Sequence, residues 1–251
     1  MDDGNSLGRV LGVIDKENKF YIDIGSGGHS NIPEQLVLDS DRTIFCEGEK
    51  RTNWGRYSTK NENFTVLEQY ITPDNVLDIF SEQAPPEKYG SPRILDIDID
   101  GYDYFVLEKI LTLYTPSILI TEINEKIPPP IKFTVKYIQG KNKSWDGSHF
   151  YGCSISKYYE LLKESYDLID LSWNNAYWTK KNHTPENWTK YTDFRAYEKF
   201  YSSRNWKEKF PYNRNVSSWL EEPPLRALEL IEDFFSSHQG KHINEDYELY
   251  L

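Results

Sequence analysis

The sequence predicts an α/β protein with a doubly wound, mostly parallel sheet and a helical, aromatic C-terminal extension. Up to about residue 125, short apolar runs alternate with helix-like segments, as is typical of strands joined by helical crossovers. The run 94–100 leads directly into a helix-like segment, and strands of this kind belong to sheets that are covered on both faces. After residue 180 the chain is polar and rich in Trp and Tyr.

The first half contains five expected strands, each an apolar run that ends near Gly, Pro or acidic residues. A helix after the third strand would be capped by Thr72 or Asp74. We expect strands over 19–25, 42–49, 64–72, 93–100 and 116–124, and helices over 72–83 and 101–114.

Three consecutive prolines, at 128–130, interrupt this alternation, because proline continues neither a helix nor a central strand. Beyond them we expect a helix and strand over 154–170, a terminal hairpin near 172–179 and an amphipathic helix over 223–237. The apolar face of that helix would carry Leu225, Leu228, Ile231 and Phe234 or Phe235. The predicted domains are 1–180, which binds the ligand, and 181–251, a lid or a dimerisation surface.

The composition excludes several classes of function. A formal net charge of -11 disfavours a nucleic-acid or anionic-membrane binder. No apolar run approaches the roughly 18 residues that span a bilayer, and the acidic N-terminus differs from a secretion signal, so we expect a cytoplasmic protein. Two cysteines are too few for a disulfide framework.

A glycine-rich turn follows the first expected strand, in "YIDIGSGGHS", and places Asp23, Gly25 and Gly27 at its end. Glycines let the backbone approach a ligand closely, and an acid about twenty residues on, Glu47, suits a ribose diol. An ordinary turn is the alternative. The pair of features favours a nucleoside cofactor, either NAD or S-adenosylmethionine. Ser30 stands where a dinucleotide fingerprint has its third glycine, which disfavours NAD.

The stretch "ILDIDIDGYDYFVLEKIL" carries Asp96, Asp98 and Asp100 on one side of a strand. Burial of carboxylates in a covered sheet is unfavourable unless something binds them. By its depth in the strand, Asp96 is expected to be structural, whereas Asp98 and Asp100 reach the carboxyl end, where open α/β sheets bind ligands.

The chain resembles class I S-adenosylmethionine-dependent methyltransferases, in particular a group related to the FkbM-type O-methyltransferases. The segments "ITPDNV", "ILDIDIDGYDYFVLEKI", "PSILITEIN", "WDGSHFYGCSI" and "NNAYW" occur in the order and rough spacing of that group. The resemblance covers about residues 20 to 180. It departs at 27–41, which is short and has Pro33 where the first helix should start.

The resemblance implies that S-adenosylmethionine lies across the carboxyl ends of the first four strands. Its methionine part would lie against the glycine turn, its ribose on Glu47 and its sulfonium and amino groups near Asp98. The implied cofactor-binding residues are Asp23, Gly25, Ser26, Gly27, Glu47, Tyr70, Ile71, Thr72 and Asp98.

Oxygen ligands end two neighbouring strands and predict a site for Mg²⁺ or Mn²⁺, formed by Asp98, Asp100, Glu122 and Asn124. Catechol-type O-methyltransferases are similar in this respect, although their Asp-Asn pair is adjacent and here Ile123 intervenes. Capping of the next helix by Asp100 or Asp103, without a metal, is the alternative.

The loop "SWDGSHFYGCS" is rich in groups that contact substrates, and His149 is a candidate general base because histidine titrates near neutral pH. A locally satisfied surface histidine is the alternative. The predicted catalytic residues are therefore Asp98 and His149.

Taken together, these features predict an S-adenosylmethionine-dependent O-methyltransferase for a small polar acceptor, a sugar or a surface-glycan precursor, with divalent-metal assistance. The predicted partners are that acceptor and a second copy in a homodimer, but no nucleic acid and no membrane. The alternatives are an NAD(P)-dependent oxidoreductase and a catalytically inactive methyltransferase fold that serves as a binding module.

Overall fold

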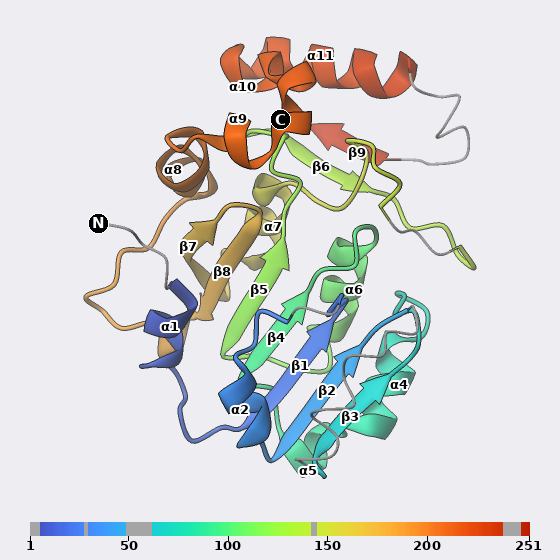
Figure 1. Cartoon of the computed structure of the whole chain (residues 1–251), viewed down its shortest axis with the longest axis vertical. Helices are drawn as coiled ribbons and strands as arrows, with labels where there is room; N and C mark the ends of the chain where they lie inside the picture. The colour runs from blue at the N-terminus through green and yellow to red at the C-terminus, as the bar shows by residue number, and fades with distance from the viewer. Residues whose placement is uncertain (1–5, 28–29, 49–61, 142–144, 238–246) are drawn as a thin grey trace.

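The chain folds around a central seven-stranded sheet in the order β3-β2-β1-β4-β5-β8-β7 (Figure 1). This computed structural model describes residues 6–27, 30–48, 62–141, 145–237 and 247–251. Five neighbouring strands run parallel, whereas β8 pairs antiparallel with both β5 and β7. The predicted doubly wound, mostly parallel α/β sheet is confirmed.

The strands form where apolar or β-branched residues run together. The five parallel strands are β1 (Phe20–Ile24), β2 (Arg42–Cys46), β3 (Phe64–Leu67), β4 (Ile94–Ile97) and β5 (Ile118–Glu122). The predicted hairpin is confirmed as β7 (Tyr166–Ser172) and β8 (Asn175–Lys180). The third strand ends at Leu67, earlier than the predicted 72, because exposed residues follow that leave the sheet.

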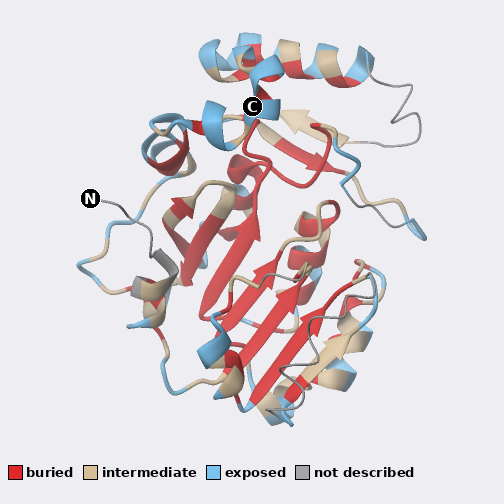
Figure 2. Cartoon of the chain, viewed as in Figure 1, coloured by how far each residue is buried: buried red, intermediate tan, exposed pale blue. Residues whose placement is uncertain are grey.

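Helices cover both faces of the sheet, and the residues along its strands are mostly buried (Figure 2). One face packs against α4 (Val76–Gln83), α6 (Asp103–Ile110) and α7 (Ile155–Leu162). The other packs against α1 (Ser6–Leu11) and α2 (Glu34–Leu38). The short helix α5 (Pro86–Tyr89) precedes β4. Alternation along each strand therefore sends apolar side chains into two separate cores.

The cap predicted for the helix after β3 is wrong. The residue before α4 is Asn75, not Thr72 or Asp74. Its side-chain oxygen accepts a hydrogen bond from the Thr72 N–H at 2.8 Å, and its amide donates to the Tyr70 carbonyl at 2.9 Å. Asn75 thus closes the turn that leads from β3 into the helix, as Asn side chains commonly do.

A second layer, the cap layer, lies beyond the carboxyl end of β5 (Figure 1). It consists of an antiparallel pair, β6 (Lys132–Val135) and β9 (Tyr247–Tyr250), with α10 (Ser218–Glu221) and α11 (Pro224–Ser237). Its apolar core combines residues from both sides of position 180, among them Ile127, Phe133, Phe150, Trp219 and Ile231. The domain boundary at 180 stays a prediction, and this core joins the two proposed parts.

The predicted helix over 223–237 is confirmed as α11, but its expected apolar face is wrong at one position. Leu225 is 68% exposed, and the buried residues are Ala227, Ile231 and Phe235.

The short elements between β8 and the cap layer are η2 (Lys181–His183), α8 (Asp193–Tyr197), η3 (Glu198–Ser202), α9 (Trp206–Lys209) and η4 (Pro211–Val216). In the described part of the chain, no helix is long and apolar enough to cross a membrane.

Candidate functional site

The candidate site lies where the parallel strands end. Strand β1 lies between β2 and β4, with Ile24 paired to Cys46 on one side and to Ile97 on the other. Strand β5 adjoins β4, with Thr121 opposite Ile97. The segments that follow these four strands therefore meet at one edge of the sheet, where open α/β sheets bind ligands.

The glycine turn after β1 is held between the ends of its two neighbours. The Gly25 N–H donates to the Cys46 carbonyl at 2.9 Å. A Cβ atom on Gly25 would lie 1.7 Å from the Asp98 carbonyl oxygen, and its φ of +92° also favours glycine. The Gly27 N–H donates to a Glu47 carboxylate oxygen at 2.7 Å. Three predicted cofactor residues, Gly25, Gly27 and Glu47, are thus brought together, with the buried Ser26 between the glycines.

A cavity of about 490 Å³ lies past the ends of β2 and β3. Gly48, the neighbour of Glu47, lines it, as do the predicted residues Tyr70 and Thr72, whereas Ile71 is buried. The Tyr70 ring packs so closely on Gly48 that a Cβ there would lie 2.3 Å from the ring. Sequence reasoning missed the remaining lining, which includes Glu68, Gln69, Asp74, Asn75, Tyr137, Gly140 and Lys141.

Two buried aspartates lie opposite each other on β1 and β4, beneath the turn. Asp23 pairs in register with Asp96, and each is 2% exposed. Burial raises the pKa of Asp23 to about 7, although a hydrogen bond from the Ser30 hydroxyl opposes the shift. Burial and the nearby Asp23 raise the pKa of Asp96 well above its usual range. Asn31 hydrogen-bonds Asp96, but the Oδ1 atom of Asp96 has no hydrogen-bond partner among the described residues.

A cluster of three carboxylates, the acid cluster, joins the ends of β4 and β5. Side-chain oxygens of Asp98, Asp100 and Glu122 lie within 4.8 Å of one another. Burial and neighbouring acids raise the pKa of Asp98 to about 8 and that of Asp100 to about 6. Asp100 has a φ of +59°, a conformation that non-glycine residues adopt mainly at special sites.

Burial and the charge of Asp98 raise the pKa of Glu122 well above its usual range, and Glu122 hydrogen-bonds Asp98. Its Oε1 atom accepts a bond from the Asn174 amide at 2.8 Å. A proton or a cation can therefore neutralise the cluster. Three convergent carboxylates also match the oxygen ligands that Mg²⁺ and Mn²⁺ prefer.

Asp103 and Asn124, which the sequence also suggested for this region, make contacts outside the acid cluster. Asp103 accepts bonds from the N–H groups of Ile99 and Gly101, both at 2.8 Å, and so holds the loop between β4 and α6. Asn124 donates its amide hydrogens to the carbonyls of His149 and Tyr151, at 3.0 and 2.9 Å. The metal role predicted for Asn124 stays a prediction, and its amide tethers the loop after the cap-layer strand β6.

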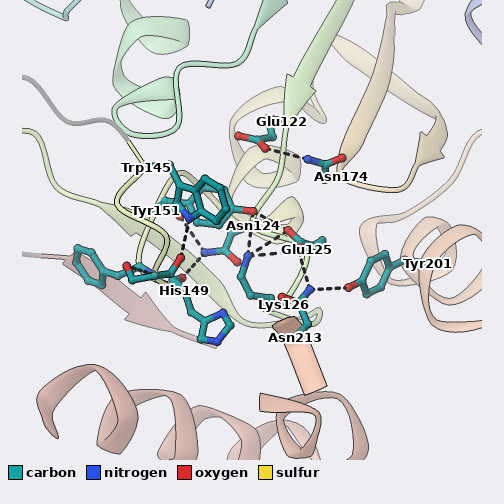
Figure 3. A network of polar contacts seen from close by, with 12 residues as sticks. Glu122, Asn124, Glu125, Lys126, Trp145, His149, Tyr151, Asn174, Tyr201 and Asn213 are labelled. Carbon is teal, nitrogen blue, oxygen red and sulfur yellow. Dashed lines mark hydrogen bonds and ion pairs between the residues drawn. The ribbon is translucent and has the colours of Figure 1, made fainter. Parts of the chain in front are cut away.

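A buried polar network that sequence reasoning missed follows β5 (Figure 3). Glu125 and Lys126 are almost fully buried, and the Lys126 ammonium donates to Glu125 Oε1 at 3.3 Å. The Tyr151 hydroxyl donates to the same carboxylate at 2.6 Å, and the Asn213 amide does so at 2.7 Å. The network joins β5, the 145–151 loop and the C-terminal segment. Buried Lys–Glu pairs persist when they are hydrogen-bonded in this way.

The predicted base His149 lies on the far side of this network. Its Nε2 atom is 3.0 Å from the Asn215 side-chain oxygen, and its ring lies 6.0 Å from Trp219 and 5.7 Å from Phe234. Figure 3 shows the imidazole pointing away from Glu122 and toward the helices of the cap layer. The base role of His149 stays a prediction, whereas the observed contacts attach the loop to α10 and α11.

Comparison with family models finds no match, and no curated protein matches the chain. Among solved structures, the chain is similar to the DhpI–SAH complex, with 13% sequence identity and a TM-score of 0.37. The match covers 69% of this chain and 80% of that chain. The strand order and the antiparallel β8 are consistent with a Rossmann-like class I methyltransferase fold.

Proposed function

We propose that the chain is an S-adenosylmethionine-dependent O-methyltransferase for a small polar acceptor, a sugar or a precursor of a surface glycan. The observation that carries the proposal is the hydrogen bond from Gly27 of the glycine turn to Glu47, whose neighbour Gly48 lines the 490 Å³ cavity. A backbone turn without room for a side chain, an acid for ribose hydroxyls and an adjoining cavity with a tyrosine together suit a nucleoside cofactor.

The residues present fit S-adenosylmethionine. Gly25, Ser26 and Gly27 would lie along its methionine part, and Asp23 below them would hold the turn through Ser30. Glu47 would accept bonds from the ribose hydroxyls, and Tyr70, Ile71 and Thr72 would flank the adenine. When bound, the cofactor supplies an activated methyl group on a positively charged sulfur.

The role of the protein in the transfer is positioning, charge stabilisation and removal of one proton. Asp98 would lie beside the positive sulfur and favour binding of the charged cofactor in a largely buried site. The bound cofactor would supply its methyl group to the acceptor oxygen, and the electron pair of the carbon–sulfur bond would stay with sulfur. The hydroxyl proton passes to the Asp98 carboxylate and then to water. Alignment of the two reactants provides most of the rate.

Replacement of Glu47 by alanine is expected to weaken the binding of S-adenosylhomocysteine by about 100-fold, because charge-assisted bonds to two ribose hydroxyls are lost. Isothermal titration calorimetry measures this change. Glu82→Ala, which removes an exposed acid from α4, is the matched control and should bind as the unaltered protein does.

The same titration tests the whole proposal. An unaltered protein that binds NADH but not S-adenosylhomocysteine would favour an oxidoreductase. Binding of neither would leave the inactive binding module as the better interpretation. Equal affinities for Glu47→Ala and the unaltered protein would remove Glu47 from the ribose site.

We further propose that a divalent cation assists the reaction at the acid cluster, held by Asp98, Asp100 and Glu122. When bound, Mg²⁺ or Mn²⁺ would neutralise the carboxylates and polarise the acceptor hydroxyl. Glu122→Gln should weaken Mn²⁺ binding at least about tenfold by removing one charged ligand, as measured by electron paramagnetic resonance titration. Asp78→Asn, at an exposed position on α4, is the control. Unchanged Mn²⁺ binding in Glu122→Gln would refute the cation site.

A further inference from the structure

Two of the large apolar side chains exposed in the described part of the chain lie side by side near the candidate site. Trp145 is 46% exposed and Tyr212 is 45% exposed, and their ring centroids are 6.2 Å apart. The ring of Tyr151 lies 6.5 Å from that of Trp145. We call Trp145, Tyr151 and Tyr212 the aromatic surface. It is built from the 145–151 loop and the C-terminal segment.

The aromatic surface is held in place from below and from the side. The Lys126 ammonium lies 4.1 Å from the centre of the Tyr151 ring and 5.6 Å from that of Tyr212, within the range of cation–π attraction. The Trp145 indole donates to the Ser148 carbonyl at 2.8 Å, across a short turn that Asp146 closes by accepting the Ser148 N–H. The rings therefore have defined positions although two of them are open to solvent.

The aromatic surface borders the acid cluster. The charges of Glu122 and Asp100 act on Tyr212 and on Lys126, and Glu122 also acts on Tyr151. Figure 3 shows Trp145 and Tyr151 together above Lys126. Lys126 belongs to the chain segment that continues from Glu122. A compound resting on these rings would be next to the carboxylates that end β4 and β5.

We infer that the aromatic surface is the acceptor subsite and that it takes a neutral, polyhydroxylated ring, such as a sugar or a cyclic polyol. The inference rests on the proposed methyltransferase function. The three carboxyl groups of the acid cluster and Glu125 outnumber the buried Lys126, so a phosphorylated or carboxylated acceptor would be repelled. The rings of Trp145 and Tyr212 are tilted by 49°, which leaves no parallel slot for a flat aromatic acceptor.

A saturated, hydroxylated ring fits both the exposed aromatic rings and the neighbouring carboxyl groups. Its C–H face covers exposed aromatic carbon and removes apolar surface from water. Its hydroxyls can hydrogen-bond the carboxyl oxygens of the acid cluster, which accept in either protonation state. Trp145 and Tyr212 would then determine acceptor specificity, which gives the C-terminal segment a part in substrate recognition.

Saturation-transfer NMR with a panel of probes tests the inference, in the presence of S-adenosylhomocysteine. The probes are the methyl glycosides of glucose, galactose and mannose, with glucose 6-phosphate and catechol for comparison. At least one neutral glycoside should bind, and Trp145→Ala and Tyr212→Ala should each weaken that binding about tenfold, equivalent to about 1.4 kcal/mol. Phe194→Ala removes an aromatic ring that is 52% exposed in α8 and should change nothing.

The outcomes separate this inference from the proposed function. Calorimetry on the same variants should show unchanged binding of S-adenosylhomocysteine, since the aromatic surface is distinct from the cavity near Tyr70. If the cofactor analogue binds but no neutral glycoside does, or if only glucose 6-phosphate or catechol binds, the acceptor subsite is overturned and the cofactor site stands. Glycoside binding that survives both substitutions overturns the assignment of these two residues.

Discussion

Gly25→Ala is expected to destabilise the fold by about 3 kcal/mol or more and to abolish cofactor binding. The new methyl group would lie 1.7 Å from the Asp98 carbonyl oxygen, and that atom belongs to the backbone and cannot rotate away. The glycine turn and the end of β4 would have to separate. The φ of +92° adds further strain for any residue with a Cβ atom. Urea unfolding measures the loss of stability, and calorimetry with S-adenosylhomocysteine measures the loss of binding.

Gly27→Ala is the matched control for stability. Gly27 lies in the same turn with a φ of +54°, but a Cβ atom there would meet nothing closer than the Gly25 carbonyl oxygen at 3.6 Å. Only the conformational penalty of roughly 1 kcal/mol is expected. If both variants lose stability equally, the close approach of Gly25 to β4 is not what determines the turn.

The sheet could be predicted from sequence because its signals are local. Short apolar runs such as those in "KFYIDIG" and "RILDIDID" mark strands of a sheet that is covered on both faces, and the glycine at position 25 marks the turn that follows. The cap of α4 was wrong because Thr72, Asp74 and Asn75 are all acceptable capping residues. Only the observed turn geometry selects Asn75.

The cap layer could not be predicted because its contacts are distant in sequence. Strand β6 pairs Lys132 with Tyr250, and no local pattern in either segment specifies the other. Leu225 was assigned to the buried face of α11 from helical spacing alone, but the face is set by where Phe133 and Phe150 pack. Tertiary packing thus decided both outcomes.

The acid cluster could be predicted from the sequence, whereas the buried network around Lys126 could not. Asp98, Asp100 and Glu122 could be predicted to meet because the ends of adjacent parallel strands are neighbours. Lys126 could not be singled out, since lysine is seldom buried and "EK" is an ordinary surface pair in sequence. Its partner Tyr151 comes from a segment far along the chain, as does Asn213, which hydrogen-bonds the neighbouring Glu125.

Asp98→Asn is expected to stabilise the protein without cofactor at pH 8 while it abolishes methyl transfer. The pKa of Asp98 is about 8 in the folded chain and about 3.9 in an unfolded one, so the folded state binds more protons between these values. The free energy of unfolding therefore falls as pH rises from about 4 to about 8. The raised pKa values of Asp23, about 7, and Asp100, about 6, act in the same direction.

The expected loss for the unaltered protein is about 2 kcal/mol or more between pH 5 and pH 8, measured by urea unfolding. An asparagine at position 98 keeps the shape of the side chain but cannot ionise, so the slope should be smaller and stability at pH 8 higher. Asp41→Asn, at an exposed position before β2, should leave the slope unchanged.

The cofactor should partly reverse this pH dependence, because S-adenosylmethionine brings a positive sulfonium to the acid cluster and S-adenosylhomocysteine does not. The increase in melting temperature on addition of S-adenosylmethionine should therefore be larger at pH 8 than at pH 5, and the difference should shrink in Asp98→Asn. With S-adenosylhomocysteine the two pH values should give nearly equal increases. If both compounds stabilise the protein equally at pH 8, Asp98 does not face the sulfonium, and the acid cluster would serve the acceptor or a cation instead.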